Sequence, residues 1–159
     1  MIGFMAALCV GDLAIDDTLV RKSGFRMIAH DHVPTEDRLS LQRIYRRDAD
    51  KATLSFNVRV GRSDAYGAEA LERFKSMMAN RLSDRRLPLP SGKSIGRDWR
   101  IYPRPGGGTT QLHVFDGHIV ISVHLHSPGV LGRARADRAA VESIARVLLA
   151  SARRQYPRP

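Results

Sequence analysis

The clearest pattern in the chain is an alternation of apolar and polar residues in its first half. Leu39, Leu41 and Tyr45 share one parity, and from residue 52 to residue 60 apolar residues alternate with Thr, Ser, Asn and Arg. Residues 48–50 (Asp-Ala-Asp) separate the two stretches with the polar side chains that are typical of a turn. Because alternation with a period of two indicates a half-buried strand, we predict a hairpin with one buried face.

Two later segments place apolar residues at the three- and four-residue spacing of one helical face. In the first segment these residues are Ala70, Leu71, Phe74, Met77, Met78 and Leu82, and in the second they are Val141, Ile144, Ala145, Leu148 and Ala152. Ser63 or Asp64 can cap the first helix, and Asp137 can open the second. The first helix should end before the Leu-Pro-Leu-Pro sequence at 87–90, because proline lacks the backbone donor that a helix needs.

A second group of strands is predicted between these helices. Its members are Lys93–Tyr102, Thr109–Phe115 and His118–His126. The last two are joined by Asp116-Gly117, and an Asp-Gly pair is a strong hairpin signal. With these two residues as the turn, Val114 would face Ile119 and Leu112 would face Ile121, giving one apolar face.

The predicted order is strand, strand, helix, three strands, helix, which gives an α+β protein with a largely antiparallel sheet and two amphipathic helices. A chain of 159 residues fits a single domain over residues 1–159. Residues 1–38 give no clear pattern beyond a short strand near residues 24–30, and residues 156–159 read as a tail.

This arrangement resembles the PsbP-like family of small α+β proteins. The resemblance is carried by the alternating strand Ala52–Val60, the helix around Ala68–Leu82, the Asp116-Gly117 hairpin with Ile119–Leu125, and the closing helix Ala139–Ala152. Bacterial members of that family are often exported lipoproteins or secretion-system adaptors, and most are non-catalytic binding proteins. The stretch from Cys9 to Asp16 is also similar to the opening of some interbacterial lipase-immunity proteins. The resemblance implies a binding function and assigns no site residue.

Charge adds a preference for acidic partners. The chain has 26 Lys and Arg against 16 Asp and Glu, and residues 81–159 hold 14 of the basic and only 5 of the acidic residues. Candidate partner-binding residues in this basic half are Arg97, Arg100, Tyr102, Arg104, Arg133 and Arg135. We expect them to contact the acidic surface of another protein. Arginines interleaved with aromatic residues also suit nucleic acid, which stays open as an alternative.

The histidines provide the main candidates for chemistry. On the predicted hairpin His113 and His118 are diagonal neighbours, and neutral imidazoles in reach of one another can bind a metal ion. Asp31 could add a carboxylate, so a small metal- or histidine-dependent enzyme is a further alternative. The sequence contains no paired catalytic carboxylates, no catalytic triad and no zinc spacing of cysteines, and it implies no cofactor.

The first ten residues carry no charge. They are too few to span a bilayer, which takes about 20 apolar residues, so no membrane span is expected. They form either a buried first element or the remnant of an export signal. The first reading places the protein in the cytoplasm and the second in the periplasm. The leading hypothesis is a non-catalytic bacterial protein-binding module, such as an immunity protein or a secretion-system adaptor. Its partner and its oligomeric state stay open.

Overall fold

The predicted strands form one antiparallel sheet in the computed structural model, which describes residues 16–34, 38–82, 91–92, 97–101, 108–128 and 134–158. The strands are β1 (Arg26–Pro34), β2 (Arg38–Arg46), β3 (Thr53–Gly61), β4 (Ser91–Gly92), β5 (Arg97–Ile101), β6 (Gly108–Asp116) and β7 (Ile119–Ser127). The helices are α2 (Thr18–Lys22), α3 (Ala65–Leu82) and α4 (Ala134–Gln155). The predicted α+β class and antiparallel sheet are therefore confirmed.

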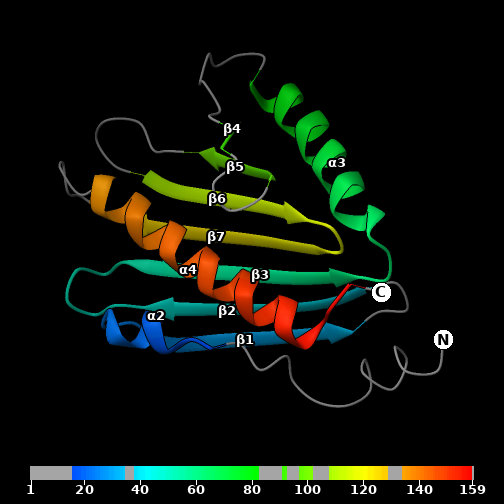
Figure 1. The fold of residues 1–159 in the computed structure, drawn as a ribbon. Helices are drawn as coiled ribbons and strands as arrows, with labels where there is room; N and C mark the ends of the chain where they lie inside the picture. Colours follow the sequence, from blue (N-terminus) through cyan, green and yellow to red (C-terminus); the bar gives the residue numbers. More distant parts are fainter. Residues whose placement is uncertain are drawn as a thin grey trace.

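Within the described residues the sheet has seven strands in the order β1-β2-β3-β7-β6-β5-β4 (Figure 1). The central pairing of β3 with β7 joins the hairpins of the first half to those of the second half. The N-terminal segment supplies β1, which is longer than the short strand expected near residues 24–30. The strand expected over 93–102 is β5, preceded by the two-residue β4.

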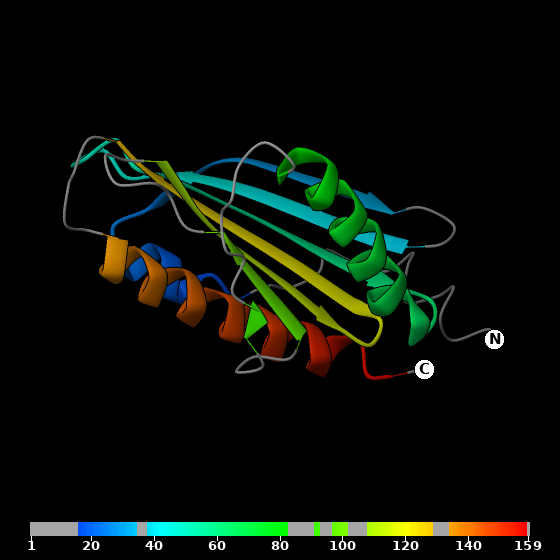
Figure 2. The same cartoon turned by 90° about the horizontal axis from the view of Figure 1, so that it is seen from above.

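The two long helices lie on opposite sides of the sheet, as Figure 2 shows. α4 packs against β7, β6 and β3 and covers the main core. The strands give this core Leu39, Leu41, Tyr45, Leu54, Phe56, Val58, Val60, Leu112, Val114, Ile119, Ile121, Val123 and Leu125, and α4 gives it Val141, Ile144, Ala145, Leu148, Leu149 and Ala152. Because these residues sit at period two on strands and near 3.6 on the helix, the sequence pattern is sufficient to build this layer.

α3 forms a smaller apolar cluster on the other face. Its residues Ala70, Leu71, Phe74 and Met78 pack on Phe115 and Val120, at one end of β6 and β7. The contacts of α3 with the sheet are confined to β6 and β7 among the larger packing contacts of the described elements. Figure 1 shows α3 away from β1 and β2, so this helix does not cover its side of those two strands.

The β6–β7 hairpin corrects one detail of the sequence analysis. Asp116 pairs with Ile119, so the turn consists of Gly117 and His118 instead of Asp116 and Gly117. Gly117 has φ +56°, which is a conformation that glycine adopts without steric cost. The expected pairing of Val114 with Ile119 is wrong by two residues. The faces are preserved, because a shift of two keeps side-chain parity.

The same turn anchors the start of α3. The N–H of Gly67 donates to the carbonyl oxygen of Gly117, at 2.6 Å. A Cβ on Gly67 would clash with that carbonyl oxygen, so the close approach requires glycine at this position. The contact satisfies one of the backbone donors that are left unpaired in the first turn of a helix.

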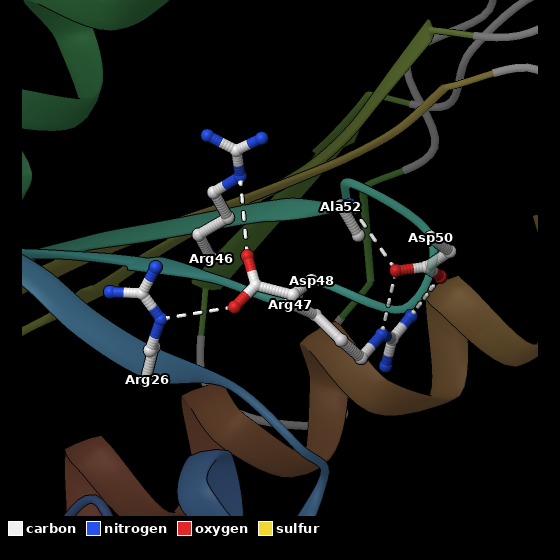
Figure 3. A network of polar contacts seen from close by, with 6 residues as sticks. All are labelled: Arg26, Arg46, Arg47, Asp48, Asp50 and Ala52. Carbon is white, nitrogen blue, oxygen red and sulfur yellow. Dashed lines mark hydrogen bonds and ion pairs between the residues drawn. The ribbon is translucent and has the colours of Figure 1, made fainter.

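A polar network holds the β2–β3 connection (Figure 3). Asp48 receives a hydrogen bond from Arg26 Nε at 3.1 Å and lies 3.7 Å from Arg46 Nε. Arg47 binds both carboxylate oxygens of Asp50, at 2.9 and 2.7 Å. The Asp48 contacts are solvent-exposed, so each should contribute less than about 1 kcal/mol to stability.

A buried carboxylate links α2 to the sheet. The hydroxyl of Tyr45, which has no exposed surface, donates to Asp17 Oδ2 at 2.8 Å. Arg21 lies 2.9 Å from Asp17 Oδ1, and Arg43 lies 3.7 Å from Oδ2. Burial, together with the hydrogen bond to Asp17, raises the pKa of Tyr45 to about 12. Tyr45 therefore acts as a neutral donor at any physiological pH.

Among the described residues, no helix combines the length and the apolar character needed to span a bilayer.

Candidate binding groove

A row of polar side chains crosses the sheet on the face where α3 lies. Backbone pairing aligns Asp31, Gln42, Asn57, Ser122 and His113 on five neighbouring strands. Alternation puts these residues on the face opposite the main core. Asp31 and His113 are four strand spacings apart, which is about 19 Å, so the structure does not bring these two candidate residues to one site.

α3 rises beside this row and turns the open face into a groove. A cavity of about 280 Å³ lies there, lined by Gln42, Ser55, Phe56, Asn57, Arg59, Phe74, Met77, His113, Ser122 and His124. A second cavity of about 190 Å³ shares four of these residues and adds Ala70, Arg73 and Phe115. We call the two adjoining cavities the α3 groove.

His113 is the most buried polar side chain of the groove, with 8% of its surface exposed. Its ring lies 4.6 Å from the ring of Phe74, measured between centroids. Its Nδ1 lies 3.0 Å from Ser122 Oγ, and its Nε2 lies 3.4 Å from Gln111 Oε1. Because the amide oxygen only accepts, these contacts fit a neutral imidazole that carries its proton on Nε2 and accepts the hydroxyl hydrogen at Nδ1.

The electrostatic surroundings keep His113 neutral. Burial, helped by the positive charges of His124 and Arg59, lowers the pKa of His113 to about 3. Burial also lowers the pKa of His124. A general base works best with a pKa near the operating pH, so His113 is too weak a base to activate Ser122 near neutrality. The Ser-His contact therefore serves structure and hydrogen bonding better than nucleophilic catalysis.

Several polar groups of the groove are open to a ligand. The side chains of Gln42, Ser55 and His124 have no hydrogen-bond partner among the described residues. Asn57 donates from Nδ2 to Ser40 Oγ at 3.3 Å, while its buried Oδ1 has no hydrogen-bond partner in the described part of the chain. A buried acceptor without a partner costs about 1–3 kcal/mol, which a donor on a ligand would offset.

The second candidate metal ligand lies elsewhere. His118 occupies the β6–β7 turn, where its Nε2 lies 2.7 Å from the carbonyl oxygen of Tyr156 and donates to it. Its Nδ1 lies 3.7 Å from Asp64 Oδ1. The structure thus pairs His113 with His124, with ring centroids 5.3 Å apart, and not with His118. Among the described residues there is no group of three or more side chains placed to hold a metal ion.

The side chains of the predicted partner-binding residues lie outside the described part of the chain. Arg97 and Arg100 lie in β5, paired through the backbone with β6, and Arg135 lies in the first turn of α4, but the side chains of all three are outside the described part. Tyr102, Arg104 and Arg133 are outside the described residues altogether. Their role in partner binding stays a prediction.

The sequence analysis missed the α3 groove. The polar residues of 53–59 were assigned to a solvent-facing side, and Met77 was assigned to the apolar stripe of its helix. The structure leaves Met77 43% exposed at the edge of the groove. One signal was present: Met77 and Met78 are adjacent, so they cannot both point at the same apolar cluster.

The chain matches no family model, no curated protein and no solved structure.

Proposed function

We propose that the protein is a non-catalytic binding module that receives an acidic partner protein in the α3 groove, in the manner of an immunity protein or a secretion-system adaptor. One observation carries this proposal. The sheet is covered by α4 on one face, whereas on the other face α3 leaves polar side chains of β2, β3 and β7 accessible beside an apolar helix wall. Surfaces with a hydrogen-bonding rim around apolar anchors are typical of protein interfaces.

The chemistry of the groove favours binding over catalysis. Its histidines have lowered pKa values: that of His113 falls to about 3, so His113 is a weak base near pH 7, and burial lowers that of His124 as well. The described residues of the lining include no carboxylate that could act as an acid, a base or a metal ligand. The groups present are neutral donors and acceptors together with arginine, which suit recognition of a partner.

The charge of the chain supports an acidic partner. The formal net charge is +10, and complementary charge raises association rates and suppresses wrong partners. On α4, Arg146 pairs with Glu142 and Arg153 pairs with Asp116, so these two charges are already compensated within the chain. The α3 groove, whose described lining includes Arg59 and Arg73 and no carboxylate, is the proposed docking site for an acidic surface.

The test starts with a tagged full-length chain, used to purify a stoichiometric partner from the native host. Affinity for that partner is then measured for the wild type, for Arg59→Glu in the groove and for Arg146→Glu on α4. Both variants change charge equally, so they differ only in position. We expect Arg59→Glu to weaken binding by tenfold or more and Arg146→Glu to change it little.

Two results would contradict the proposal. In the first, the two variants weaken binding equally, which would show that only net charge matters. In the second, the chain purifies without a protein partner and binds DNA or RNA with an affinity that falls steeply with salt, as counterion release requires. That result would favour a nucleic-acid function.

A further inference from the structure

Arginine lines the α3 groove. Among the residues that the structure describes, the lining contains no Asp or Glu, and Arg59 lines both cavities. The field of Arg59 reaches the buried ring of His113, where it contributes to the lowered pKa. Arg73, at the edge of the smaller cavity, is balanced by Glu69 at 3.9 Å. Arg59 is therefore the one arginine that the described linings of both cavities share.

Arginine at this position suits a carboxylate. A guanidinium has five N–H donors in a planar fork, so a contact within the chain leaves donors for a ligand. The fork matches the two oxygens of a carboxylate and can bind both at once. Asn57, which shares β3 with Arg59, and Ser55 add hydrogen-bonding groups on the same strand face.

The helix side of the larger cavity is apolar. Met77 is 43% exposed there, and Phe74 lies one helical turn before it. Methionine is flexible and polarisable, so it adapts to apolar side chains of different shapes. Exposed next to arginine, it offers an anchor for a large apolar side chain beside the carboxylate position.

The shape of the groove favours a chain segment over a small molecule. Small-molecule sites enclose most of the ligand surface, with about 70–90% of it buried. Here Gln42 and Met77 are exposed, and Ser55, Asn57 and Arg59 are half-buried, so the walls are low. The two cavities share Arg59, Phe74, Met77 and His113 and so adjoin along α3, as an elongated ligand requires.

We propose that the α3 groove recognises a peptide segment of the partner that has an acidic residue next to a large apolar residue, with the carboxylate at Arg59 and the apolar side chain at Met77. This inference rests on the proposed binding function and names the chemistry that its site recognises.

The probe is a phage-displayed library of random twelve-residue peptides, selected on the immobilised full-length chain. We expect enrichment of peptides in which Asp or Glu lies within two residues of Leu, Ile, Met, Phe or Trp. The dissociation constant of an enriched peptide is then measured by fluorescence polarisation for the wild type and for Arg59→Gln, Arg59→Lys and Met77→Ser. Arg146→Gln on α4 is the matched control, because it removes the same charge from the opposite face.

We expect Arg59→Gln and Met77→Ser each to weaken binding by about tenfold, which is 1.4 kcal/mol. Arg59→Lys should fall between Arg59→Gln and the wild type, because lysine keeps the charge and loses the planar fork. Arg146→Gln should stay within twofold of the wild type. Thermal unfolding of each variant confirms that the fold is intact.

The inference is overturned if no peptide is enriched, if enriched peptides lack acidic residues, or if Arg59→Gln binds as well as the wild type. It is also overturned if free succinate binds as tightly as the peptide, which would indicate a small-anion site. If one of these results occurs but Arg59→Glu still weakens binding of the native partner, only the peptide inference fails. When the native partner is insensitive to Arg59→Glu, the proposed function fails at this site.

Discussion

The neutral state of His113 makes folding stability depend on pH. Burial, with the positive charges of His124 and Arg59, lowers its pKa from the usual 6.5 to about 3 in the folded chain, while the unfolded chain keeps a value near 6.5. Between about pH 3 and pH 6.5, His113 is therefore protonated in the unfolded chain and neutral in the folded chain. The contribution of His113 is therefore fully present above pH 6.5 and is lost as the pH falls toward 3.

The magnitude follows from the pKa difference. Below pH 6.5 each pH unit lowers the free energy of unfolding by about 1.4 kcal/mol through His113. Lowering the pH from 7 to 5 should therefore reduce the stability by about 2 kcal/mol. The assay is urea unfolding at pH 7, 6 and 5 for the wild type and for His113→Leu, with the free energy extrapolated to water. Leucine cannot take a proton, and other titrating groups cancel in the comparison.

We expect the wild type to lose about 2 kcal/mol more than His113→Leu between pH 7 and pH 5. The absolute stability of the variant does not matter, because the comparison uses the slope with pH. Equal slopes for the two chains would refute the reasoning, since they would show that His113 titrates alike in the folded and the unfolded state.

Three further predictions concern the packing around the groove and the sheet. Gly67→Ala should destabilise the chain by about 1–3 kcal/mol in urea unfolding, because the added methyl group meets the carbonyl oxygen of Gly117. At an exposed helix position Gly→Ala stabilises by about 1 kcal/mol, so a stability gain in this variant would contradict the contact. Tyr45→Phe should cost about 1–2 kcal/mol, because Asp17 loses a buried donor, and an unchanged denaturation midpoint would count against that hydrogen bond. Asp48→Asn should change stability by less than about 1 kcal/mol, since its ion pairs are exposed; a larger loss would mean that the network of Figure 3 holds the hairpin.

The sequence was sufficient for the layer that depends on periodicity. The alternation over 52–60 and the apolar stripe over 141–152 lie in β3 and α4 as expected, because a strand or helix with one apolar face has only one way to bury it. The hairpin turn was misplaced by one residue. Asp-Gly is the stronger local signal for a two-residue turn, but tertiary contacts decided here, since Gly117 and His118 both bind other segments.

The α3 groove could not be predicted from the same patterns. Its polar residues Gln42, Asn57 and Ser122 are far apart in sequence, and only the pairing of β2, β3 and β7 aligns them. Solvent-facing strand residues and groove-lining residues give the same alternation, because the difference depends on where a distant helix packs. The predicted neighbours His113 and His118 came from a hairpin register that was wrong by two residues. In the observed register Ser122 pairs with His113, and this places His124 beside the ring of His113.

The most direct test of the α3 groove as the binding surface uses methionine methyl groups as probes in NMR spectra. Met77 lies in the groove and is 43% exposed. Met27 on β1 is 39% exposed and pairs with Tyr45, so it lies on the α4 face of the sheet, opposite to the groove. When the purified native partner is added to the full chain, we predict that the methyl resonance of Met77 shifts or broadens and that of Met27 does not. A bound partner that leaves Met77 unchanged would contradict the assignment of the groove.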